Sequence, residues 1–178
     1  KKILAVALIN HMKRITKNPL LEKGNVLLMG STGVGKTELV KQLAEMTSLP
    51  LGIADASSLT SSGWAGDDPE TVLFDLYQKA DRDVEKAKFG IVFIDEIDKI
   101  AKDGDTRYAS SNAQRGLLRI IEGTVVGVPV NQSQRVYIDT KNILFICAGA
   151  FSGLQKIVDQ RKSQKSIGFT SSVDKGDY

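Results

Sequence analysis

The sequence predicts an α/β domain in which helices cover both faces of a parallel β-sheet. A glycine-rich segment, residues 30–37, joins a short apolar run to a stretch with helical periodicity, as a loop between a strand and a helix does. Residues 91–94 form an unbroken run of β-branched and aromatic residues that ends at two carboxylates, which is typical of a central parallel strand. Runs of both kinds alternate along the chain, as they do in doubly wound α/β folds.

The composition is that of one ordinary domain. The 178 residues are 42% hydrophobic, and 24 basic residues balance 21 acidic ones, which argues against a nucleic-acid-binding surface. The single cysteine, Cys147, excludes an internal disulfide and a Cys/His zinc site and favours a reducing compartment. No apolar run approaches the roughly 18 residues of a membrane span, so we expect no membrane partner.

The first third of the chain predicts two helices and two strands. A helix over residues 3–16 ends before Asn18-Pro19, and we expect it to pack on the core through apolar positions that include Ile3, Val6 and Met12. A strand at 25–29, a helix at 37–46 and a second strand at 49–54 follow, and residues 55–66 form a polar loop.

The remainder predicts three helices, two strands of the sheet's type and a hairpin. Asp68-Pro69 begins a helix that continues to residue 87, the longest expected in the chain. The strand at 90–96 should lie beside the first strand. A helix at 110–122, a β-hairpin at 124–130 and 135–138, a buried strand at 142–147 and a short helix follow.

The glycine-rich segment has the G-x-x-x-x-G-K-[ST] spacing of a phosphate-binding loop. Its glycines allow successive N–H groups to point at an anion, Lys36 adds a mobile positive charge, and Thr37 offers a hydroxyl to Mg²⁺. We therefore expect ATP and Mg²⁺ as cofactors of a P-loop NTPase. The candidate nucleotide-binding residues are Gly30, Ser31, Thr32, Gly33, Val34, Gly35, Lys36, Thr37 and Glu38.

Two carboxylates at the end of the 90–96 strand turn this binding site into a candidate hydrolytic site. Asp95 stands where a metal-anchoring Asp is expected, opposite Thr37, and Glu96 can accept a proton from the attacking water. Glu96 and Lys36 are the candidate catalytic residues, and Thr37 and Asp95 are the candidate metal ligands. A solvated strand end remains the alternative for Asp95-Glu96, and we expect Asp98 and Lys99 to form a surface pair.

Four segments resemble the ClpX family of AAA+ ATPases over nearly the whole chain. These segments are residues 63–68, 94–100, 118–124 and 143–151. The resemblance implies that residues 1–161 are an AAA+ nucleotide-binding large subdomain and that 162–178 are a flexible tail. It also implies a homo-hexameric ring that unfolds tagged or unfolded proteins and delivers them to the peptidase ClpP. The compartment would be the bacterial cytoplasm or the mitochondrial matrix.

The resemblance also assigns two binding segments outside the phosphate site. Gly63, Trp64, Ala65 and Gly66 match in kind the family's substrate-gripping pore loop, with Trp64 as the gripping side chain. From the residues alone, Trp64 could equally be a core residue or an interface anchor. Ile167, Gly168 and Phe169 match the family's ClpP-docking loop.

The chain departs from the family pattern at three places. Residues 106–115 lack the Gly-rich acidic character of a second pore loop, and residues 131–134 are short and neutral where the family has a basic cluster. At the γ-phosphate-sensing position the candidates are only Cys147 and Ala148. The helical small subdomain and its arginines are absent from these 178 residues, so we expect slow hydrolysis by this chain alone.

Two alternatives to an unfoldase remain open. One is a nucleic-acid motor or clamp-loader-type ATPase, and the other is a scaffold switched by nucleotide. The lone histidine, His11, is expected to be a packed or exposed helix residue, and contact with a nucleotide base is the lesser alternative.

Overall fold

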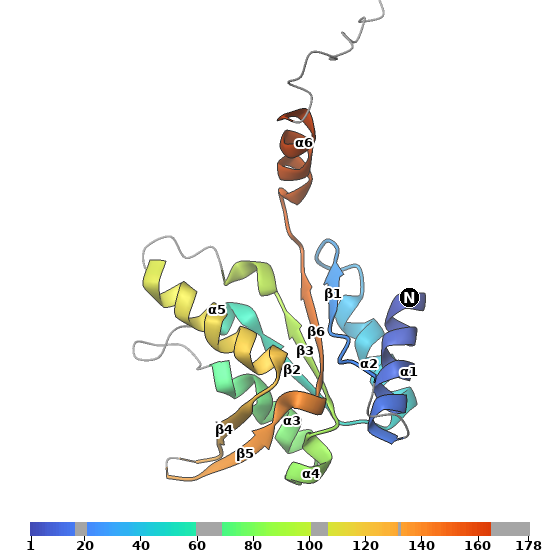
Figure 1. Ribbon diagram of the computed structural model, residues 1–178, viewed down its shortest axis with the longest axis vertical. Coiled ribbons are helices and arrows are strands. Elements are labelled where there is room, and N and C mark those ends of the chain that lie inside the picture. The colour runs from blue at the N-terminus through green and yellow to red at the C-terminus, as the bar shows by residue number, and fades with distance from the viewer. Residues whose placement is uncertain (17–20, 60–68, 101–106, 132, 165–178) are drawn as a thin grey trace, which may run out of the picture.

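The central element is a four-stranded parallel sheet with helices on both faces, which confirms the predicted fold class (Figure 1). The computed structural model describes residues 1–16, 21–59, 69–100, 107–131 and 133–164. The strands of the sheet, in spatial order, are β1 Val26–Met29, β6 Leu144–Gly149, β3 Ile91–Asp95 and β2 Leu51–Asp55.

The strand order corrects one prediction. We expected β3 to lie beside β1, but β6 separates them: Val26 of β1 pairs with Ile146, and Ile94 of β3 pairs with Cys147. Both β3 and β6 are continuous apolar runs, so each is suited to a central position and neither sequence specifies its neighbour. The pairing is a long-range property.

The two faces of the sheet bury two separate hydrophobic clusters. Side chains alternate along each strand, so Phe93 and Ile146 face one cluster while Ile94 and Phe145 face the other. Helices α1 Lys2–Thr16 and α2 Lys36–Thr47 cover the first face. The 3₁₀ helix η2 Pro69–Leu73 and helices α3 Phe74–Lys79 and α5 Arg107–Glu122 cover the second (Figure 1).

Helix α1 forms as predicted but packs through a different face. Its buried residues are Leu4, Leu8 and His11, whereas Ile3 is 81% exposed and Val6 is 54% exposed. The helix has apolar residues on more than one side, so the 3.6-residue period alone does not select the face that meets the sheet. The predicted core positions Ile3, Val6 and Met12 were therefore wrong.

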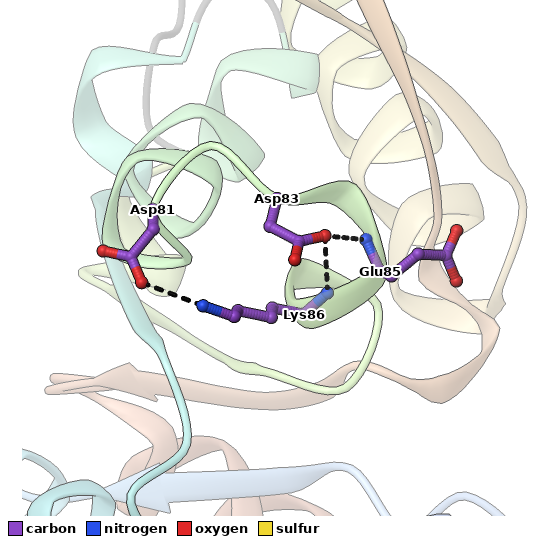
Figure 2. Close-up of polar contacts among 4 residues, drawn as sticks. All are labelled: Asp81, Asp83, Glu85 and Lys86. Atoms are coloured by element: carbon purple, nitrogen blue, oxygen red, sulfur yellow. Dashed lines mark hydrogen bonds and ion pairs between the residues drawn. The ribbon is translucent and has the colours of Figure 1, made fainter.

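The predicted long helix over 68–87 is broken. Its described part consists of η2, α3 and a further short helix, α4 Val84–Ala87. Asp81 and Arg82 between α3 and α4 have positive φ values of 58° and 61°, which a helix cannot contain. Figure 2 shows the beginning of α4, where the Asp83 carboxylate caps the helix by accepting hydrogen bonds from the N–H groups of Glu85 and Lys86.

The last third of the chain adds a hairpin and a projecting helix. Strands β4 Val125–Pro129 and β5 Arg135–Asp139 form the predicted antiparallel hairpin. Helix α6 Leu154–Gln164 continues from the end of β6 and extends away from the sheet (Figure 1). Short 3₁₀ turns lie at Ala56–Ser58, Ile97–Lys99 (η3) and Thr140–Asn142 (η4). None of the helices in the described ranges is long and apolar enough to span a membrane.

Candidate active site

The glycine-rich loop joins β1 to α2 in a conformation that only small residues adopt readily. Gly33 and Gly35 have φ values of 82° and 83°, in the left-handed region that disfavours residues with a Cβ. Gly35 directly precedes α2, so the first N–H groups of that helix are free of intrahelical partners. The positive end of the helix dipole and these N–H groups together suit an anion at this position.

Two hydrogen-bonding sets hold the loop in place. The Gly30 N–H donates to the Gly149 carbonyl oxygen at 3.2 Å, which ties the start of the loop to the end of β6. The Lys36 ammonium donates to the carbonyl oxygens of Gly30 at 2.7 Å and Ser31 at 3.0 Å. The Lys36 side chain thus folds back onto its own loop.

Thr37 and Asp95, the predicted metal ligands, are in direct contact. The Thr37 hydroxyl donates to Asp95 Oδ2 at 3.1 Å, although the two residues are 58 positions apart. Asp95 Oδ1 accepts the Glu96 N–H at 2.8 Å. A hydroxyl and a carboxylate are hard oxygen donors, and Mg²⁺ commonly takes only one or two carboxylates from a protein. These residues fit that ion.

Glu96 occupies an unusual backbone position. Its φ and ψ are 53° and 32°, so a residue with a full side chain adopts the left-handed conformation at the end of β3. Such a conformation costs about 1–3 kcal/mol and persists only where the surroundings enforce it. The turn is closed by the Lys99 N–H, which donates to the Glu96 carbonyl at 2.8 Å.

A cavity of about 360 Å³ lies at this edge of the sheet. It collects most of the predicted site residues from the loop, from α2 and from the end of β3. Those that line it are Thr32, Gly33, Gly35, Lys36, Thr37, Glu38, Asp95 and Glu96. Gly30, Ser31 and Val34 are not part of the lining, and the Val34 side chain is 62% exposed.

Five further residues line the cavity and were not predicted. They are Lys41, Asp98, Lys99, Gly149 and Ala150. Lys41 lies four residues after Thr37 on α2, a spacing that places both on one helix face and could have revealed it. Gly149 and Ala150 have no chemical signature in the sequence, and only the pairing of β6 with β1 and β3 brings them here.

The prediction for Asp98 was wrong as well. We expected a surface pair with Lys99, but the half-buried Asp98 carboxylate accepts the N–H groups of Ala150 and Phe151, each at 3.2 Å. The carboxylate therefore joins η3 to the segment that follows β6.

Neither candidate for a γ-phosphate sensor reaches the cavity. Cys147 packs against the cluster beneath α5, and burial raises the pKa of its thiol to about 11. Ala148 is fully buried on the opposite face. The described part of β6 instead presents Gly149 to the cavity.

Two predicted binding segments lie outside the described residues. These are the pore-loop residues Gly63, Trp64, Ala65 and Gly66, and the docking residues Ile167, Gly168 and Phe169. Their roles stay predictions.

Comparison with known proteins agrees with the motifs. The profile of the family described as AAA domain (Cdc48 subfamily) matches residues 21–176. The ATP-dependent Clp protease ATP-binding subunit ClpX of Treponema denticola is 48% identical over 98% of this chain and 46% of its own length. The subunits of the same name from Borrelia duttonii and Porphyromonas gingivalis are 47% and 41% identical over 97% of this chain, and 44% and 46% of their lengths. The predicted resemblance to ClpX is confirmed, and the chain spans less than half of these relatives.

Proposed function

Because this chain belongs to the AAA domain (Cdc48 subfamily) family, we propose that it binds ATP with Mg²⁺ in the cavity beside Lys36 and hydrolyses it. The observation that carries the proposal is the contact between Thr37 and Asp95 at the head of α2, next to Glu96. It joins a phosphate-binding loop to a carboxylate pair, which are two of the parts that hydrolysis of a nucleoside triphosphate requires.

Binding depends on the loop and the start of α2. The free N–H groups around Gly33 and Gly35 donate to phosphate oxygens, and the Lys36 ammonium leaves the Gly30 and Ser31 carbonyls to contact phosphate.

Hydrolysis depends on the carboxylates at the end of β3. Thr37 and Asp95 would hold Mg²⁺, which when bound neutralises charge on the phosphates. Glu96 accepts a proton from the attacking water, since it lines the same cavity one residue beyond Asp95. Two adjacent carboxylates thus take different roles.

Substitution of Glu96 by Gln tests this assignment. The amide keeps the shape of the side chain but cannot accept a proton, so we expect ATP affinity within about threefold of the wild type and hydrolysis reduced at least about 100-fold. Nucleotide binding by titration calorimetry and phosphate release measure the two quantities. Lys36→Ala serves as the comparison, because it should weaken binding itself. Unchanged phosphate release in the Gln variant would exclude Glu96 as the base.

We further propose that the chain is the nucleotide-binding part of an ATP-driven protein unfoldase acting with ClpP in the bacterial cytoplasm. The similarity over 97–98% of the chain to bacterial Clp protease ATP-binding subunits supports this. In this proposal the subunits form a homo-hexamer, Trp64 grips unfolded or tagged polypeptide, and residues 167–169 dock on ClpP.

A further inference from the structure

Asp98 connects the segment after β3, which carries Glu96, to the segment after β6. It lies in η3, two residues after Glu96, and its two carboxylate oxygens each accept one backbone N–H, from Ala150 and from Phe151. Both donors belong to the segment that leaves β6. A single side chain therefore bridges the ends of two neighbouring parallel strands, beyond the last backbone pair of the sheet.

The bridge continues to the phosphate loop. The residue before Ala150 is Gly149, whose carbonyl oxygen accepts the Gly30 N–H at 3.2 Å. An unbroken sequence of contacts thus leads from Glu96 through Asp98 and Ala150 to Gly30, where the glycine-rich loop begins. The position of the proposed base, Glu96, relative to the phosphate loop therefore depends on Asp98.

Gly149 is shaped to accept this bridge. A Cβ at this position would lie 2.5 Å from Asp98 Oδ1 and 2.8 Å from the Phe151 ring, so no larger residue fits without displacing the carboxylate. The close approach of Asp98 explains why β6 ends in glycine at the cavity.

The backbone on both sides of the bridge is strained. Glu96 has a φ of 53° and Phe151 a φ of 50°, the left-handed conformation that non-glycine residues avoid. The Asp98 carboxylate lies between these two residues and bonds to one of them directly. Its two charge-assisted hydrogen bonds are suited to hold both in place.

We propose that Asp98 is a positioning residue for hydrolysis, which bridges η3 to Ala150 and Phe151 and so fixes Glu96 relative to the phosphate loop. The inference rests on the proposed ATP hydrolysis at this cavity. Asp98 does not bind nucleotide in this proposal, so its loss misplaces the base while the phosphate loop stays formed. A misplacement of about 1 Å can reduce turnover by about 100-fold.

The test compares two variants of Asp98 in the full chain. Asp98→Ala removes both acceptors, and Asp98→Asn keeps the shape but points an amide N–H₂ at one of the two backbone donors. We expect kcat for ATP hydrolysis to fall at least about 10-fold in both variants, with the ATP dissociation constant within about threefold of the wild type. If Asp98→Ala does not fold, Asp98→Asn decides the question.

Asp83 offers a matched control. Its carboxylate also accepts two backbone N–H groups at the start of α4, from Glu85 at 2.8 Å and Lys86 at 3.3 Å (Figure 2). Asp83 is not among the residues that line the cavity. Asp83→Asn should lower the melting temperature about as much as Asp98→Asn and leave kcat unchanged. If the two variants changed kcat equally, the effect of Asp98 would be one of general stability and the proposal would be wrong.

A double-mutant cycle with Gly149→Ala separates the bridge from other effects. The added methyl group displaces Asp98, so Gly149→Ala should lower kcat by itself but add little in the Asp98→Ala background. Full additivity of the two effects on kcat would show that the bridge is not what positions Glu96.

The positioning role and the proposed function can fail separately. If kcat of Asp98→Asn stayed within threefold of the wild type while Glu96→Gln abolished hydrolysis, the proposed function would stand and the positioning role would be wrong. A wild type that does not hydrolyse ATP would remove both.

Discussion

At the scale of single residues, His11 shows how a buried polar group is satisfied by a distant part of the chain. Its Nε2 lies 3.0 Å from the carbonyl oxygen of Phe89, and the residue is only 4% exposed. A carbonyl oxygen can only accept, so Nε2 carries a proton in this contact. Burial lowers the pKa of His11 despite this hydrogen bond, and the nearby charges of Arg14 and Lys23 lower it further.

The lowered pKa of His11 predicts a loss of stability in mild acid. Below the ordinary pKa of 6.5, His11 of the unfolded chain binds a proton, whereas His11 of the folded chain stays unprotonated until a lower pH. The free energy of unfolding therefore falls as the pH falls. Gln in place of His11 can keep the donor to Phe89 without titrating. We expect the wild type to lose up to about 1.4 kcal/mol per pH unit more than His11→Gln below this point.

Urea unfolding at pH 7.5 and at several values down to pH 5 measures the difference. The two proteins should differ by a constant amount above neutrality and converge or cross as the pH falls. If the free energies of unfolding of the two proteins changed in parallel from pH 7.5 to pH 5, the fold would not be holding His11 neutral.

Lys23 makes a second long-range polar contact. Its ammonium donates to the carbonyl oxygens of Ile121 at 2.7 Å and Thr140 at 2.9 Å, and lies 4.7 Å from the centre of the Phe145 ring. Burial lowers the pKa of Lys23 to about 8. The residue thus joins the segment before β1 to the end of α5 and to η4.

At the scale of elements, the contact between β2 and α3 depends on a glycine. Gly52 lies on β2 opposite Val92, and its missing side chain lets the backbone of Leu76 on α3 approach. A Cβ at Gly52 would lie 2.6 Å from the Leu76 nitrogen and 2.8 Å from its Cα. Backbone atoms cannot move aside as the end of a flexible side chain can, so α3 would shift as a unit.

Substitution of Gly52 by Ala should therefore destabilise the domain. We expect a loss of about 1–3 kcal/mol in the free energy of unfolding, the usual cost of overpacking. Gly24→Ala is the matched control, because nothing lies within 4 Å of a Cβ there, and it should change stability by less than about 0.5 kcal/mol. Chemical denaturation of both variants measures the difference, and equal stability would show that α3 adjusts without cost.

At the scale of the whole molecule, hydrolysis must be connected to mechanical work if the chain serves an unfoldase. The cavity lies where β1, β3 and β6 end, and α6 leaves the sheet from the same edge (Figure 1). A conformational change at the phosphate loop would therefore arise close to the segment that joins β6 to α6. The proposed gripping residue, Trp64, is separate in sequence from all cavity residues.

Substitution of Trp64 by Ala should separate the two activities. In the full ring we expect ATP hydrolysis within about twofold of the wild type and at least about 10-fold slower unfolding of a stably folded reporter protein, because the large apolar grip on polypeptide is lost. Met46→Ala, which removes an exposed side chain from α2, is the control and should change neither rate. Normal reporter unfolding by the Trp64 variant would exclude Trp64 as the gripping residue, whereas a wild type that does not unfold the reporter would favour the nucleic-acid motor or the scaffold.

The local sequence by itself determined the loop, the strand types and the identity of the main site residues. Gly33, Gly35, Lys36 and Thr37 are recognisable because backbone conformation and phosphate chemistry restrict the residue at each position. The fold class follows from periodicity, which short segments carry independently of the rest of the chain.

Only the tertiary structure decided which elements meet. The position of β6 between β1 and β3 and the buried face of α1 depend on contacts between residues far apart in sequence. Asp98 illustrates the consequence: its sequence context is that of a surface charge, but the N–H groups that it binds are 52 and 53 positions away. The hydrophobic periodicity of a segment shows which of its residues are suited to burial. Which strand or helix the segment packs against depends on long-range contacts that the segment alone does not encode.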